Sequence, residues 1–181
     1  MFSLMKRFAV ASAVAAGAIL LMTLPVTTQS PACDPDSGGI KLPTGFCALV
    51  VASNIGPARH LTVAPNGDVY VADTNNHRIQ KLSRDGQSLA MWGGEGDGPA
   101  QFRFPQSVAL DSQGMIYVAD SRNHRVQRLT PQGAYSAAWG SPGSAPGQFS
   151  SPQGLAVDQQ GLLYVADTDN NRVQRINLGS T

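Results

Sequence analysis

The feature that most constrains this chain of 181 residues is a phrase that occurs three times. Its copies begin at Tyr70, Tyr117 and Tyr164, each 47 residues after the last, and read YVADTNNHRIQKL, YVADSRNHRVQRL and YVADTDNNRVQRI. The register continues outside the phrase, for example at Gly67, Gly114 and Gly161. A fixed period of this length is typical of repeat architectures, in which neighbouring copies bury each other's apolar faces.

Within the first copy, apolar residues alternate with polar ones between turns rich in Gly, Asn and Asp. This pattern predicts four short antiparallel strands, over His60–Ala64, Asp68–Ala72, Arg78–Leu82 and Ser88–Trp92. Because no stretch after Cys33 shows helical spacing with caps, the expected fold class is all-β. Four-stranded antiparallel units joined by Gly/Pro-rich connectors are the blades of a β-propeller. The repeats predict three blades, over residues 58–104, 105–151 and 152–178.

One copy carries a resemblance to a known family. The segment from Pro152 to Arg175 reads PQGLAVDQQGLLYVADTDNNRVQR and resembles the NHL repeat at almost every position of its sequence pattern. The resemblance covers Ala58 to Leu178. It implies a propeller whose blades present loops for partner binding, and it says little about the partner, because a fold does not determine a function.

The N-terminal segment has the layout of a secretory signal. Lys6 and Arg7 precede an apolar run from Phe8 to Leu24, and the small residues Ser30 and Ala32 occupy the −3 and −1 places of a possible cleavage point. We expect residues 1–32 to be a signal peptide, so that the mature chain is periplasmic or extracellular. The alternative is a retained membrane anchor that leaves the chain facing the periplasm.

Residues 33–57 form a short leader that contains both cysteines of the chain, Cys33 and Cys47. In an exported protein two nearby cysteines usually form a disulfide bond, and closing so short a loop is worth about 3 kcal/mol in the chain-entropy model. The alternative is that Cys33 ends a degenerate lipoprotein box. The apolar stretch Phe46–Ala52 predicts a strand that belongs to no repeat.

The leader and the first repeat resemble a second family. The residues that carry this likeness are Cys33–Gly39, Leu42–Cys47, Ala58–Leu61 and Ala64–Val71. They are similar to the start of soluble quinoprotein sugar dehydrogenases of the sorbosone dehydrogenase type, over residues 33–71. In those enzymes the residues that hold pyrroloquinoline quinone and abstract the hydride lie in later blades, where this chain has NHL copies. The likeness therefore supports fold and export, and implies no catalytic residue and no cofactor here.

The strand count predicts how the blades close. The third repeat supplies three strands and lacks the fourth, whereas the Phe46–Ala52 strand is spare. Closed propellers usually have four to eight blades, so three are too few. We expect a homodimer in which two chains form a six-bladed ring and exchange this strand. The alternative is that the chain is a truncated remnant with exposed sheet edges.

The charge balance gives no reason to expect nucleic acid as a partner. Of the 13 Lys and Arg residues, two precede the cleavage point, which leaves 11 against 12 Asp and Glu. A balanced surface offers no field that would attract a polyanion or an anionic membrane.

Residues that are identical in every copy are expected to be architectural. An Asp stands five residues before an Arg in each repeat, on either side of the turn between the second and third strands. An ionised carboxylate at this place can accept hydrogen bonds from the Arg and from turn amides. We expect this role for Asp73 and Arg78, Asp120 and Arg125, and Asp167 and Arg172.

Positions that differ between copies are better candidates for function. On the loop between the second and third strands, we expect a binding surface for a protein or a small molecule that includes Asn75, His77, Arg122, His124 and Asp169. The alternative is drift of surface residues. We expect no catalytic residue and no metal: the three histidines, His60, His77 and His124, do not repeat in the third copy, and Asp167–Asn170 lacks the Gly and distal Glu of a calcium loop.

Taken together, the sequence favours an exported, non-catalytic interaction module. The first alternative is a remnant or half-propeller of an enzyme, similar to quinoprotein sugar dehydrogenases or to the zinc-dependent amidating lyase found among NHL-like propellers. The second is the periplasmic sensor module of a membrane-anchored protein.

Overall fold

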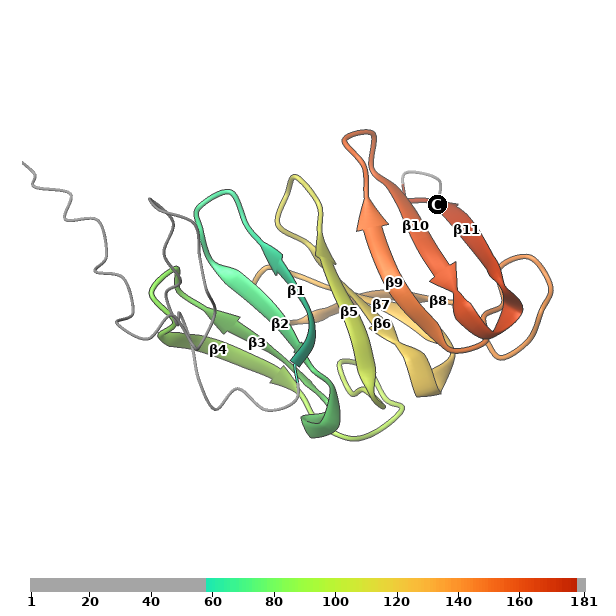
Figure 1. Cartoon of the computed structure of the whole chain (residues 1–181), viewed down its shortest axis with the longest axis horizontal. Coiled ribbons are helices and arrows are strands. Elements are labelled where there is room, and N and C mark those ends of the chain that lie inside the picture. Colours follow the sequence, from blue (N-terminus) through green and yellow to red (C-terminus); the bar gives the residue numbers. More distant parts are fainter. Residues whose placement is uncertain (1–57, 179–181) are drawn as a thin grey trace, which may run out of the picture.

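The computed structural model describes residues 58–178, and every regular element of this part is a β-strand or a single 3₁₀ turn. The strands form three antiparallel sheets whose order follows the sequence. Figure 1 shows the sheets fanned out as an arc, with the first strand of each sheet lying beside the next. The all-β propeller prediction is confirmed, and the three blades do not form a closed ring.

The blades have nearly identical layouts. The first contains β1 (Ala58–Val63), β2 (Val69–Asp73), β3 (Arg78–Leu82) and β4 (Ser88–Gly93). The second contains β5 (Pro105–Leu110), β6 (Ile116–Asp120), β7 (Arg125–Leu129) and β8 (Tyr135–Trp139). The third contains β9 (Pro152–Val157), β10 (Leu162–Asp167) and β11 (Arg172–Asn177). The strands expected in the first blade are all present, with ends that differ from the expected ones by at most two residues.

A 3₁₀ turn joins the second and third strands of each blade. These turns are η2 (Thr74–Asn76), η3 (Ser121–Asn123) and η4 (Thr168–Asn170). Each ends in a left-handed residue, namely His77, His124 or Asn171, with φ between 52° and 54°. Since His and Asn tolerate this conformation better than bulky or β-branched residues, the local sequence suits the turn.

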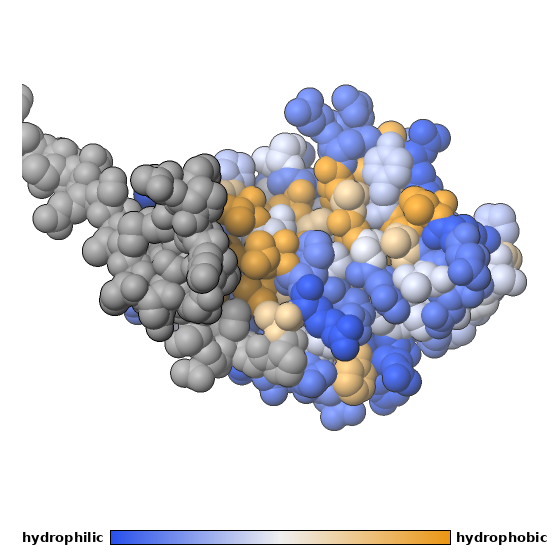
Figure 2. Space-filling model, viewed as in Figure 1, coloured by the Kyte–Doolittle hydropathy of each residue, from blue (hydrophilic) through white to orange (hydrophobic). Residues whose placement is uncertain are grey.

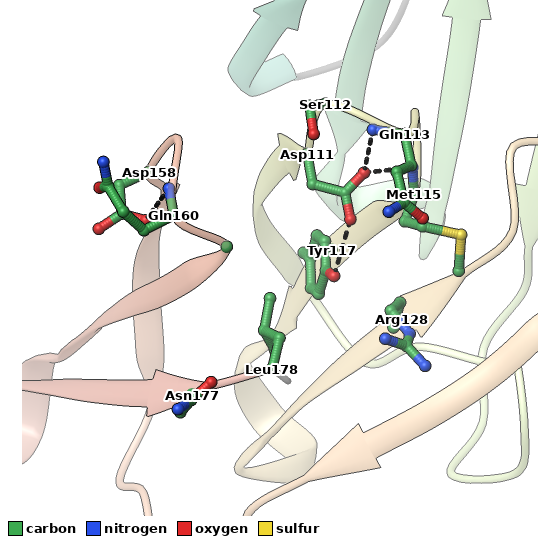
Figure 3. A pocket seen from close by; sticks show the side chains of 11 residues that line it. Asp111, Ser112, Gln113, Met115, Tyr117, Arg128, Asp158, Gln160, Asn177 and Leu178 are labelled. Carbon is green, nitrogen blue, oxygen red and sulfur yellow. Dashed lines mark hydrogen bonds between the residues drawn. The ribbon is translucent and has the colours of Figure 1, made fainter. Parts of the chain in front are cut away.

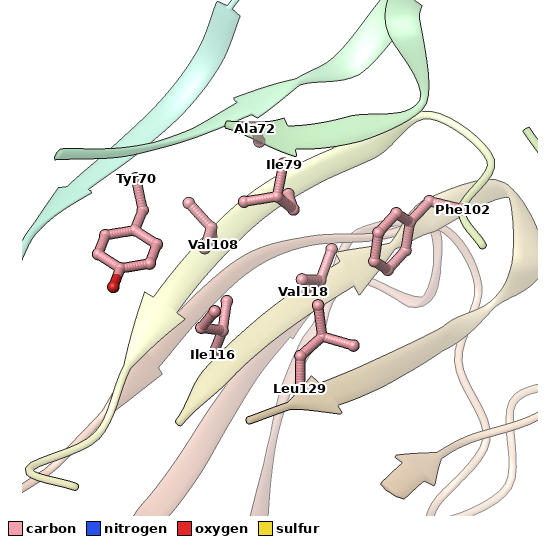
Figure 4. Close-up of a cluster of buried hydrophobic side chains, with 8 residues drawn as sticks. All are labelled: Tyr70, Ala72, Ile79, Phe102, Val108, Ile116, Val118 and Leu129. Carbon is pink, nitrogen blue, oxygen red and sulfur yellow. The ribbon is translucent and has the colours of Figure 1, made fainter. Parts of the chain in front are cut away.

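The core lies between blades. We call the side of a blade that packs on the next blade its front face, and the side that packs on the preceding blade its back face. At the first junction, Tyr70, Ala72 and Ile79 on the front face of blade one meet Val108, Ile116, Val118 and Leu129 on the back face of blade two (Figure 4). At the second junction, Tyr117, Ala119 and Val126 meet Leu155, Leu163 and Val165.

Two ring contacts follow the same repeat. Trp92 stacks on Tyr70, and Trp139 stacks on Tyr117, each with ring centroids 6.2 Å apart. Both tryptophans are partly buried and pack against the clusters between the blades. The Trp92 ring lies so close to Gly133, in the β7–β8 turn of the next blade, that any side chain there would overlap it. Burial between blades thus accounts for the tryptophans.

Several expectations concern residues outside 58–178. They are the signal peptide or anchor of residues 1–32, the disulfide bond between Cys33 and Cys47, the Phe46–Ala52 strand and its exchange, and the leader part of the dehydrogenase resemblance. Within 58–178, the structure contains no helix that could span a membrane.

Candidate functional site

A buried carboxylate organises the loop end of each blade. The Asp120 side chain is fully buried and accepts hydrogen bonds from the Arg103 amide at 2.7 Å, from Arg125 Nε at 2.8 Å and from Gln127 Nε2 at 3.0 Å. Asn123 Nδ2 adds contacts at 2.9 and 3.0 Å. One carboxylate therefore fixes both the turn of its own blade and the connector that arrives from the preceding blade.

The same network recurs around the other two carboxylates. Arg78 Nε lies 2.8 Å from Asp73, and Arg172 Nε lies 2.7 Å from Asp167. Burial raises the pKa of Asp167, but hydrogen bonds from the Ser150 amide and from neighbouring side chains outweigh burial, so that its pKa lies below the ordinary value of 3.8. The group stays ionised at neutral pH, and its lone pairs are used by the fold.

The two loop histidines join consecutive blades. The Phe104 amide donates to His77 Nδ1 at 3.1 Å, and the Ser151 amide donates to His124 Nδ1 at 3.2 Å. When Nδ1 accepts, Nε2 is the ring nitrogen that can donate. Each histidine thus holds the connector on the next blade and keeps one N–H donor for other contacts.

Arg122 and Asp169 occupy equivalent places on neighbouring loops. Their amides donate to the carbonyls of Arg103 and Ser150, both at 3.1 Å, so the two loops are fixed in the same way. Both side chains are exposed, and within residues 58–178 neither forms an ion pair. Asn75, the third member of this slot, is also exposed. The scaffold therefore presents a cation and an anion on adjacent blades.

A groove lies between the second and third blades at this end. It has a volume of about 430 Å³ and is lined only by polar residues, namely Gln106, Ser121, Arg122, His124, Ser151, Gln153 and Asp169. Three of the five residues expected for a binding surface therefore come together here. The other two, Asn75 and His77, lie on the first blade outside the groove.

One difference between the repeats changes the space beside this groove. At the first junction, the slot equivalent to Ser151 holds Phe104, whose ring lies 4.6 Å from the His77 ring and 5.6 Å from the Arg122 guanidinium carbon. A serine cannot fill the same space at the second junction. Phe104 and Ser151 are not among the residues predicted from the sequence for this surface, although the sequence shows that they differ at matched repeat positions.

A second hollow, of about 420 Å³, lies at the opposite end of the same junction (Figure 3). Asp111 on its wall accepts hydrogen bonds from the Gln113 and Met115 amides at 2.8 and 2.9 Å and from the Tyr117 hydroxyl at 3.1 Å. Asp158 does the same in the third blade, and the Leu162 amide in particular keeps the pKa of this carboxyl below its usual value. These carboxylates brace the turns of their own blades.

The described residues contain no group of three or more His, Cys, Asp or Glu side chains that could hold a metal ion. The Asp167–Asn170 turn directs its Asp167 carboxylate inward to Arg172 and Gln174. The side chains that line the groove supply hydrogen-bond donors and acceptors and two opposite charges.

Comparison with known families identifies the repeat. The NHL repeat model matches three segments, residues 59–82, 102–129 and 149–176. A curated relative, NHL repeat-containing protein 3 of Homo sapiens, is 46% identical over 57 residues, which are 30% of this chain and 16% of that protein. The chain is thus an NHL-repeat protein, and three consecutive copies make up the part that the structure describes. The likeness of residues 33–71 to sorbosone dehydrogenases is not shown by these matches.

Solved structures show the same fold at low identity. A streptogramin B lyase structure aligns with a TM-score of 0.55 at 22% identity, over 71% of this chain and 40% of that one. The hydrazine synthase of Kuenenia stuttgartiensis gives 0.55 at 17%, over 77% and 37%. An auxiliary nutrient binding protein from Bacteroides thetaiotaomicron gives 0.54 at 18%, over 64% and 36%. This chain spans about two fifths of each of these structures, and at such identities the likeness concerns the fold alone.

Proposed function

We propose that the chain is an exported, non-catalytic binding module, and that the groove between blades two and three is its ligand site. The observation that carries the proposal is that Arg122 and Asp169, which have opposite charges, line the same groove. They stand in one slot of a repeated scaffold, differ in every copy, and are exposed without an ion-pair partner in the described part of the chain. Residues that vary within one slot of a repeated scaffold and surround a hollow are candidates for recognition.

The lining of the groove restricts the ligand. Because no apolar side chain lines it, burial of apolar surface contributes little to binding, and hydrogen bonds and charges must supply the affinity. Arg122 can pair with a carboxylate and Asp169 with an ammonium group. His124 adds an Nε2 donor, and Gln106 and Gln153 add both donors and acceptors. A peptide segment or an amino-acid-like molecule that carries both charges matches this set.

A binding experiment tests the proposal. The purified chain is titrated calorimetrically with a panel of amino acids and short peptides, and the best binder is then measured against variants. Arg122→Ala and Asp169→Ala should each weaken binding about tenfold, which corresponds to about 1.4 kcal/mol. Arg84→Ala and Asp85→Ala serve as matched controls, since both residues are exposed in the β3–β4 turn at the opposite end of the first blade. No binder in the panel, or equal loss in the controls, would contradict the assignment.

A further inference from the structure

Two faces of the arc have no neighbouring blade among the described residues, namely the front face of blade three and the back face of blade one. On the front face, Val173 is 67% exposed, whereas the equivalent Ile79 and Val126 are 0% exposed at the two internal junctions. The same position is thus fully buried wherever a blade follows. Val173 thus occupies a position that is buried at both internal junctions, but no described blade packs on it.

On the back face of blade one the edge strand β1 shows the matching feature, whereas Val71 on β2 and Leu82 on β3 of the same face are 1% and 3% exposed. Leu61 is 57% exposed, while its equivalents Val108 and Leu155 are 0% and 9% exposed. Val63, next on the same face, is 58% exposed. Figure 2 shows apolar surface over the first blade, and again over the third, in a mostly hydrophilic view.

A polar contact is also left unmade. At the first junction the Thr74 hydroxyl donates to the Pro105 carbonyl of the next blade at 2.7 Å, and at the second the Ser121 hydroxyl donates to the Pro152 carbonyl. The equivalent hydroxyl in blade three, that of Thr168, makes only a long bond of 3.4 Å to the Ala166 carbonyl of its own blade. Its expected acceptor, by the repeat, is the Ala58 carbonyl at the start of β1.

We infer that the partner of both faces is a second copy of this chain, docked head to tail. The front face of blade three would pack on the back face of blade one of the other copy, with Val173 against Leu61 and Val63 and with the Thr168 hydroxyl on the Ala58 carbonyl. These are the contacts that the two internal junctions already make, so the interface continues an established one. Two copies related by a twofold axis give six blades, within the usual range for closed propellers.

One difference distinguishes the new junction from the internal ones. The Val108 amide donates to His60 Nδ1 at 3.3 Å, and the Leu155 amide donates to Ser107 Oγ at 3.2 Å. The third residue of this slot is Gly154, which offers no side-chain acceptor to the Leu61 amide. The junction between copies therefore forms one hydrogen bond fewer, and we expect it to open before the internal junctions do.

The test measures the molar mass of the purified chain by light scattering, independently of any ligand. We expect twice the mass of a single chain for the native protein. Val173→Asp and Leu61→Lys should each give monomers, because each introduces an unpaired charge into an apolar contact. An equimolar mixture should restore dimers of one copy of each, since such a pair has one native junction and one Asp–Lys junction. Tyr135→Asp is the control: Tyr135 is 43% exposed on β8, in the middle blade, and the dimer should persist.

Several outcomes would overturn the head-to-tail dimer. A folded native monomer would overturn it and would indicate that another segment of the same chain covers the faces. Open-ended oligomers would overturn the closed ring. If a charge variant loses its β-sheet circular dichroism, Val173→Ser replaces it, for which we expect at least a tenfold rise in the dimer dissociation constant. An unchanged constant would likewise overturn the inference.

Discussion

The two loop-end junctions share their backbone contacts and differ in what they present. In both, a histidine accepts from the connector amide, a loop amide donates to a connector carbonyl, and a buried Asp holds the turn. At the first junction Phe104 lies between His77 and Arg122. At the second, Ser151 leaves a groove beside Asp169. Repetition thus fixes the scaffold, and a few unrepeated side chains distinguish a filled junction from an open one.

The largest loss of stability should come from the buried carboxylate that both junctions share. Asp120→Asn and Asp167→Asn each leave a buried network without its charge, and we expect each to lower the free energy of unfolding by about 3 to 5 kcal/mol. Urea unfolding followed by circular dichroism measures the loss. The losses should be equal within error, because the two carboxylates accept from equivalent donors. A large difference between them would show that the junctions do not share one scaffold.

Exchanging the residues at positions 104 and 151 should give each junction the character of the other. Phe104→Ser removes the ring contacts to His77 and Arg122, and we expect it to cost about 1 to 2 kcal/mol. Ser151→Phe should fill the groove and abolish binding of any ligand that depends on Arg122 and Asp169, with little loss of stability. Calorimetric titration and thermal unfolding of both variants test this pair. Retained binding in Ser151→Phe would place the ligand elsewhere.

Substitutions of the loop histidines His124 and His77 should change the stability by a smaller amount. His124→Ala removes the acceptor of the Ser151 amide and should cost about 1 kcal/mol. His124→Gly removes the same bond but suits the left-handed backbone, so that its loss should be smaller. The two variants are compared by thermal unfolding, with His77→Ala and His77→Gly as the matched pair at the first junction. Equal losses for Ala and Gly would indicate that the backbone conformation is not a source of strain.

The smallest expected effect is the dependence of the Asp167 contribution to stability on pH. Because the pKa of Asp167 is lower in the folded chain than the ordinary 3.8, its contribution to stability is complete above that value and is lost as the pH falls through the folded pKa. The difference in unfolding free energy between the native chain and Asp167→Asn should therefore be constant near neutral pH and narrow below about pH 4. Denaturant unfolding between pH 2 and 7 measures it. A constant difference over this range would contradict the assignment.

Much of the architecture is predictable from sequence, because repeat position carries it. The alternation around Val69 and Val71 predicts β2, and the phrase from Arg78 to Leu82 predicts β3 with both bounds correct. The expected surface of Asn75, His77, Arg122, His124 and Asp169 was only partly a unit: three of these residues line the groove and two do not. Sequence could not separate them, since the five residues occupy similar places on three equivalent loops.

The sequence by itself determined that this chain folds into copies of one antiparallel blade, since period-two alternation and left-handed turn residues are local properties of the chain. The tertiary structure decided which of the varied residues share a hollow, because that depends on how much space Phe104 or Ser151 fills between two blades. It also showed that Leu61 and Val173, buried by their repeat position, have no neighbouring blade among residues 58–178. Packing between blades is a property of neighbours in space, and no single repeat contains it.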